Sequence, residues 1–440
     1  MFFEFLKSQD RLEYIQLSTK NFRNTPGFEH HVIVPTLRFL KSIKIDLDFM
    51  LSSDDTLFPR AMIKSWILSS AKTLKHFRLE DQGSHLAVGG NRDLREFDWS
   101  EELLKEAADE NNKIQYPRLP NLNGFEISSR LQLRRYLPKL ELLFDYTILT
   151  SFRLDGHLER CPETCELLAK VVSKFENLQS LRLENTHHFK DGLVIQSAPP
   201  LRKLVYDNGQ YGGDLPDYEC FLRHKDTLRH LHLLNADPIT IEYLNDVLEI
   251  WSWPCLETLI VLSENAAYTP EGYTKPLKLP ASLKALHTLQ TKLIDCDDPN
   301  SPHPDYFPYS CQYADKPSTE WINWWKNYFL SELPALQFPT IDTIPVGNGR
   351  EGSNSTLQHA NRPIRRRPSL RALLLGDVRR SGWAPFHFRA VYGEDDKICR
   401  WEGVAIEDIV ARDPDLAILE KMDWGKAQWG RSIDVRGKWW

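Results

Sequence analysis

The chain has 440 residues, of which 41% are hydrophobic and 26% are charged, a composition typical of folded proteins. Its 55 Lys and Arg against 61 Asp and Glu give a formal net charge of -6, so no overall attraction to nucleic acid or anionic lipid is expected. The 7 cysteines are scattered and odd in number, which argues against a disulfide scaffold, and no uncharged run reaches the roughly 18 residues that span a bilayer. We therefore expect a cytoplasmic or nuclear protein with no membrane contact.

A repeated apolar pattern dominates the first two thirds of the chain. It has the form Leu-x-x-(Leu, Ile or Phe)-x-apolar, and it begins in a loose form at Leu12, Leu40, Leu74, Leu94, Leu122 and Leu149. It becomes more regular at Leu178, Leu201, Leu228 and Leu256, and a partial unit with only the first two apolar positions follows at Leu283. The last two apolar positions of each unit alternate with other residues, which is the period of a strand. Each unit therefore predicts one short β-strand.

The segments between these strands predict helices. Residues 163–175 and 240–251 carry apolar side chains at spacings of three and four, as an amphipathic helix does. A strand and a helix repeated in this way cannot bury their apolar faces without a stacked neighbour. The predicted fold class is α/β: a curved solenoid with short parallel strands on the concave side and helices on the convex side.

The pattern fails between residues 291 and 369. Residues 295–317 are rich in Asp and Pro, and 334–368 are rich in Pro, Gly, Asn and Arg, so both stretches predict loops. Between them, 318–333 predicts a helix whose Trp-rich face docks on the end of the stack. The predicted organisation is a solenoid over 1–290, an insertion over 291–369, and a last repeat-like strand with an irregular extension over 370–440, including a helical run at 406–422.

This pattern resembles the leucine-rich repeat family, over roughly residues 11–290 and again at 370–375. The resemblance implies a protein-binding solenoid. One feature departs from the family, whose units place Asn or Cys three residues after the last strand leucine. Here those positions hold Thr186, Gly209, Ala236 and Glu264.

The concave side of such a solenoid is its usual binding face, and it is formed by the strand residues that flank the buried apolar pair. Counting along the regular strands, we expect a partner with a mixed charged and apolar surface to bind there. The same residues would also suit a solvated face that has no ligand. The candidate partner-binding residues are Arg153, Asp155, Arg182, Glu184, Lys203, Asp207, His230, His232, Ile260 and Leu262.

Other candidate sites have simpler explanations. His157, Cys161 and Cys165 are four apart but lack a fourth zinc ligand, and the acidic run 295–298 lacks the glycine and glutamate of a calcium loop, so we expect buried thiols and a solvated loop. The basic stretch 362–380 fits a nuclear import signal, a contact for an acidic partner or a plain linker. No enzyme or cofactor motif occurs, so we expect no enzyme and no cofactor. An enzyme without a recognisable motif, with a site assembled from distant residues, is the less favoured alternative.

Within the repeat family, the irregular unit length and the Pro-preceded strands, such as 199–201, are similar to the repeat regions of fungal F-box proteins. The resemblance implies the substrate-recognition part of a ubiquitin ligase, monomeric, with a protein substrate on the concave face. Some ten residues precede the first strand, whereas an F-box needs about forty, so we expect no F-box in this chain. Contact with the ligase adaptor would then need an F-box encoded upstream. The alternative is a leucine-rich repeat scaffold with no role in ubiquitin transfer.

Overall fold

The computed structural model describes two compact units, Met1–His224 and Lys225–Trp440, which we treat separately. The described residues are 6, 8–9, 11–18, 36–47, 65–81, 119–128, 137, 144–155, 162–184, 191–207, 219–234, 238–261, 279–280, 282–286 and 288–292, with the strands 338–342, 372–376, 386–392 and 398–403. The described residues do not include the predicted strand at Leu94 or the predicted helices over 318–333 and 406–422. They also leave out the basic stretch 362–380, apart from the strand at 372–376.

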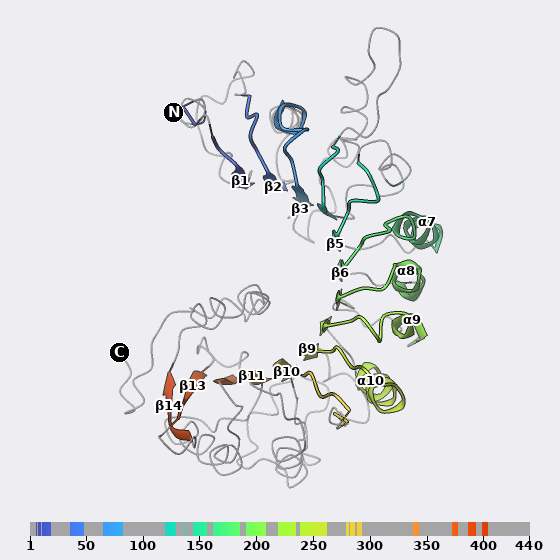
Figure 1. Cartoon of the computed structure of the whole chain (residues 1–440), viewed down its shortest axis with the longest axis vertical. Helices are drawn as coiled ribbons and strands as arrows, with labels where there is room; N and C mark the ends of the chain where they lie inside the picture. Colours follow the sequence, from blue (N-terminus) through green and yellow to red (C-terminus); the bar gives the residue numbers. More distant parts are fainter. Residues whose placement is uncertain are drawn as a thin grey trace, which may run out of the picture. The chain divides into compact units, whose positions relative to one another are not determined.

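The first unit contains a parallel sheet in which each strand pairs with the next one along the chain (Figure 1). Its strands are β1 (Tyr14–Ser18), β2 (Ser42–Leu47), β3 (His76–Asp81), β4 (Gly124–Ser128), β5 (Ser151–Asp155), β6 (Ser180–Glu184) and β7 (Lys203–Asp207). Each lies where the repeated pattern predicts a strand. The α/β class and the parallel strand pairing of this unit are thus confirmed.

Helices follow the last three strands of this unit. They are α7 (Pro162–Val172), α8 (Asp191–Ser197) and α9 (Glu219–Leu222), and Figure 1 shows them on one side of the sheet. Pro162 begins α7 where no backbone donor is needed, Glu163 lies in the first turn, and Lys170 lies in the last. The predicted helix 163–175 is confirmed over most of its length.

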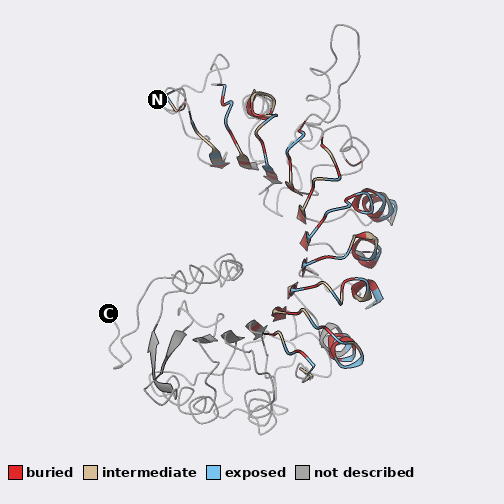
Figure 2. Cartoon of the chain, in the orientation of Figure 1, coloured by how far each residue is buried: buried red, intermediate tan, exposed pale blue. Residues whose placement is uncertain are grey.

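The core lies between the sheet and these helices. The second and fourth residues of β5 and β6 are fully buried, as are Leu168 and Val172 of α7 (Figure 2). Rings at the second strand position stack from strand to strand, with centroids 6.0 Å apart for Phe77 and Phe125 and 6.1 Å apart for Phe125 and Phe152. This shared position therefore gives neighbouring units a continuous apolar core.

One backbone hydrogen-bond arrangement repeats at the start of the strands. In β6, the N–H groups of Gln179 and Ser180 both donate to the carbonyl of Thr150, at 2.9 and 3.0 Å. The same arrangement occurs at β2, β3, β4, β5 and β7, and at β9 in the second unit. In each case the N–H groups one and two residues after the first leucine of the repeated pattern donate to one shared carbonyl. The units therefore share a three-dimensional geometry as well as an apolar pattern.

Side chains add a second set of links between units. The position just before the first leucine of a unit holds Thr73, Asn121 and Asn177. Asn121 Nδ2 and Asn177 Nδ2 each donate to the carbonyl two residues before the first leucine of the preceding unit. Thr73 Oγ1 lies nearest to the carbonyl of Leu40, the first leucine of the preceding unit, at 2.9 Å. The four positions at which the family places Asn or Cys lie outside the described residues, and in this chain they are Thr186, Gly209, Ala236 and Glu264. Within the described part, these Thr and Asn side chains provide polar links between adjacent turns.

The second unit begins with strand β8 (His230–Leu234), helix α10 (Pro238–Ile250) and strand β9 (Thr258–Val261), followed by β10 (Thr288–Lys292). Strands β8 and β9 and helix α10 agree with the predicted strands and with the predicted helix 240–251. Strand β10 begins later than the predicted unit at Leu283, because Leu289 rather than Leu286 pairs with Leu259 of β9. Strands β11 (Phe338–Asp342) and β12 (Ala372–Gly376) continue the parallel pairing, and β13 (Phe386–Tyr392) and β14 (Ile398–Gly403) add antiparallel strands.

Strand β11 differs from the loop that composition predicts for 334–368. Phe338-Pro-Thr-Ile-Asp342 contains a proline, which lacks a backbone donor and is usually excluded from inner strands. Pairing with β10 on one side and β12 on the other determines this conformation. The antiparallel pair β13 and β14 was likewise not expected in the irregular extension.

Candidate partner-binding face

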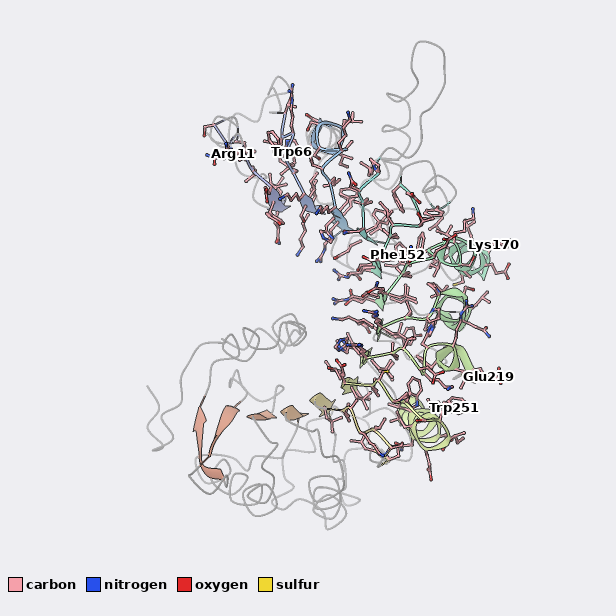
Figure 3. All side chains as sticks on the ribbon, viewed as in Figure 1. Arg11, Trp66, Phe152, Lys170, Glu219 and Trp251 are labelled. Atoms are coloured by element: carbon pink, nitrogen blue, oxygen red, sulfur yellow. The ribbon has the colours of Figure 1, made fainter. Side chains whose placement is uncertain are left out.

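The first unit has a sheet face opposite α7, α8 and α9, which we call the open face. It is formed by the first, third and fifth residues of each strand, and Figure 3 shows strand side chains projecting away from the helices. Parallel register aligns these residues in rows across the sheet, so that Glu126, Arg153 and Arg182 are successive neighbours on β4, β5 and β6.

Arg153 lies at the centre of an ionic network on the open face. Its Nη1 donates to Glu126 Oε2 at 3.1 Å, its Nη2 to Asp155 Oδ2 at 3.0 Å, and its Nε to Glu184 Oε2. Arg182 Nη2 donates to the other oxygen of Glu184. Four residues predicted from sequence, Arg153, Asp155, Arg182 and Glu184, are therefore brought together in one network.

Two members of this network were missed by the sequence analysis. Glu126 on β4 accepts from Arg153 and also pairs with Arg78 on β3, whose Nε lies 3.5 Å from Glu126 Oε2. Both are the third residue of their strand, the same position as Arg153 and Arg182. The alternation of apolar and charged residues that would have identified them is present in the looser N-terminal units. The candidate residues, however, come only from β5 onward.

The network alters the ionisation of its members. Burial raises the pKa of the Glu126 carboxyl, but the charges of Arg153 and Arg78 outweigh burial and hold this pKa below its usual value. Burial lowers the pKa of Arg153, and the carboxylates of Glu184, Asp155 and Glu126 more than reverse that effect. Glu126 and Arg153 therefore remain charged at neutral pH.

His76 lies beside this network at the first position of β3. Its partner in the register is Gly124, and a Cβ added at Gly124 would collide with the His76 ring, so the glycine provides room for this side chain. Partial burial lowers the pKa of His76, although the charge of Glu126 opposes this. His76 is consequently an uncharged neighbour of the network at neutral pH.

The candidate residues on β7 lie deeper than those on β5. Asp207 is buried, as is Val205 between it and Lys203, which is half-buried. The candidates on β8 and β9 in the second unit are also buried: His230 is 8% exposed, and His232 and Ile260 are 0% exposed. Leu262 lies outside the described residues. In this structure the accessible candidate residues of the first unit are therefore Arg153, Asp155, Arg182 and Lys203, each half-buried, whereas Glu184 of β6 is buried.

A buried histidine links secondary-structure elements on the helix side of the first unit. The Leu201 N–H donates to His224 Nδ1 at 3.2 Å, and His224 Nε2 lies 3.0 Å from the Ile195 carbonyl. The first contact requires Nδ1 to be an acceptor, so Nε2 carries the proton and donates to Ile195. Burial lowers the pKa of His224 to about 4. The neutral imidazole thus connects α8 with the segment that enters β7.

The described residues contain no group of His, Cys, Asp and Glu able to hold a metal ion. Cys165 is a buried thiol, whereas His157, Cys161 and the acidic run 295–298 lie outside the described part. No described helix combines the length and the apolar character needed to cross a bilayer.

Comparison with known proteins identifies no relative: no protein-family model matches the chain, and no curated protein matches it.

Proposed function

We propose that this protein is a leucine-rich repeat solenoid that binds a protein partner on the open face of its first unit. The observation that carries the proposal is the ordered network on this face, where Arg153 holds three carboxylates in place. Holding long charged side chains in one geometry costs conformational entropy, and partly desolvating them costs free energy. Binding of a partner to this preorganised surface offsets these costs, because the charged side chains need not be ordered again when the partner binds.

The repeated backbone geometry supports the solenoid part of the proposal. Stacked strand and helix units expose one long sheet face, and repeat proteins commonly bind partners there. Within the described part of the first unit, α7, α8 and α9 lie on the opposite side and leave this face uncovered by helices (Figure 1).

The proposal is tested with bulky substitutions on the two sides of the full-length chain. Ser180→Trp places a large side chain on the open face of β6, whereas Lys170→Trp places one on the exposed surface of α7. A partner captured by the wild-type chain and identified by mass spectrometry is then measured against both variants. We expect Ser180→Trp to weaken its binding at least tenfold and Lys170→Trp to leave it unchanged. The opposite result would place the binding surface on the helix side.

For the more specific role, we propose that the bound partner is a substrate presented to a ubiquitin ligase of the F-box type. Support for this role comes from the sequence resemblance in unit length and in Pro-preceded strands. The contact with the ligase adaptor would come from an F-box outside this sequence or from a separate protein. Co-purification of a cullin and its adaptor from native cells tests the role. Capture of the partner without either of them, in repeated experiments, would favour a scaffold with no role in ubiquitin transfer.

A further inference from the structure

The network carboxylates on β4 and β5 lie nearer to solvent than the guanidiniums that hold them. The side chain of Glu126 is 38% exposed, whereas those of Arg78 and Arg153 are 16% and 12% exposed. On β6 the order is reversed, since Glu184 lies deeper than Arg182. A partner approaching β4 and β5 therefore meets mainly carboxylate oxygen.

The remaining hydrogen-bonding capacity of the network also favours a partner that donates hydrogen bonds to carboxylates. Arg153 directs all three guanidinium nitrogens at Glu126, Asp155 and Glu184, and the Nε of Arg182 is buried out of reach of a partner. A carboxylate can accept about four hydrogen bonds. Both ion pairs of Glu126 end on Oε2, so its Oε1 retains capacity to accept. The remaining guanidinium N–H groups belong to side chains that are only 12% to 22% exposed, so the free acceptor capacity of Glu126 is the more accessible part of the network.

Net charge alone would not identify the partner. Glu126, Asp155 and Glu184 outnumber Arg153 and Arg182 by one on β4, β5 and β6, and Arg78 on β3 restores the balance. Recognition therefore depends on which charges are accessible. The basic groups are used to orient the acidic groups, and the acidic groups face outward over β4 and β5.

We infer that the open face over β4 and β5 recognises a basic segment of the partner protein, with Lys or Arg side chains donating to Glu126 and Asp155. This inference depends on the proposed function and specifies the chemistry of its partner. Arg153 acts as a positioning residue, because it holds both carboxylates in place and is too enclosed to contact the partner itself.

The test uses the full-length chain and three fluorescent peptides of about 12 residues: Lys-Ser repeats, Glu-Ser repeats and Gly-Ser repeats. Fluorescence anisotropy at low ionic strength is expected to detect binding of the Lys-Ser peptide only. Raising the salt to 0.5 M should weaken this binding, because the Debye length then falls to about 4 Å. Glu126→Gln and Asp155→Asn should each weaken it about fivefold, the upper range for an exposed ion pair.

The matched control is Glu176→Gln, which removes an exposed carboxylate from the turn before β6, away from the open face. We expect no change in affinity for the Lys-Ser peptide. An equal loss with Glu176→Gln, equal binding of the Glu-Ser peptide, or no binding of the Lys-Ser peptide would each overturn the inference.

The captured partner separates this inference from the proposed function. If binding of the partner is lost with Ser180→Trp but is insensitive to salt and to Glu126→Gln, that result would support the open face as the binding surface and refute recognition of a basic segment. Insensitivity to Ser180→Trp as well would refute both.

Discussion

Acidification should weaken the packing of α8 against the start of β7, because it protonates His224. Since Nδ1 accepts the Leu201 N–H, a second proton on the ring breaks that hydrogen bond and places a charge in a site where His224 is 0% exposed. The folded pKa of about 4 lies below the ordinary value of 6.5, so the unfolded chain binds more protons between these pH values. The stabilising contribution of the neutral ring is complete above pH 6.5 and is lost as the pH falls toward 4.

The magnitude follows from the shift in pKa. Lowering the pKa from 6.5 to about 4 corresponds to about 3.5 kcal/mol in full, at about 1.4 kcal/mol per pKa unit. Between pH 7.5 and pH 5.0 the loss amounts to about 2 kcal/mol, because protonation of the unfolded state is then nearly complete while the folded ring remains mostly neutral. This corresponds to about a thirtyfold fall in the protection of nearby amides from hydrogen exchange.

Hydrogen exchange measured by mass spectrometry, corrected for the intrinsic pH dependence, provides the assay. Peptides covering 191–207 should lose protection between pH 7.5 and pH 5.0, whereas peptides from α7 should change less. In His224→Gln the protection of 191–207 should be lower at pH 7.5 and should no longer depend on pH in this way. Equal pH dependence in the wild type and in His224→Gln would refute the proposed role of the histidine.

Three further predictions concern stability, measured by urea unfolding of the full-length chain. Arg153→Ala should destabilise the first unit by about 3 kcal/mol, because Glu126, Asp155 and Glu184 then lose their shared counter-charge; stability equal to the wild type would show that the network contributes nothing. Asn177→Ala should cost about 1 kcal/mol through loss of its hydrogen bond to the preceding turn, and Glu176→Ala serves as its neutral neighbour. Leu181→Asp should cost several kcal/mol and unfold adjacent units, since Leu181 is fully buried; unchanged unfolding would contradict the assigned strand faces.

The sequence was sufficient to locate most strands because period-two alternation and the repeated leucine are local signals. Leu181 and Leu183 had to face a core if β6 formed, and Arg182 had to face the other way. The same reasoning placed the helices α7 and α10. It failed for β11, where a proline argued for a loop and pairing with β10 and β12 gave a strand.

The sequence alone thus determined the repeating unit and the face on which the side chains of β1 to β7 lie, since both depend on the chain's local periodicity. Only the tertiary structure decided which charges meet. The contact of Arg153 with Glu126 and Glu184 depends on the register between β4, β5 and β6. The segments that connect these strands differ in length, so the sequence does not show this register directly. The burial of His224, His230 and His232 likewise depends on groups distant in the sequence, and no local pattern encodes their positions.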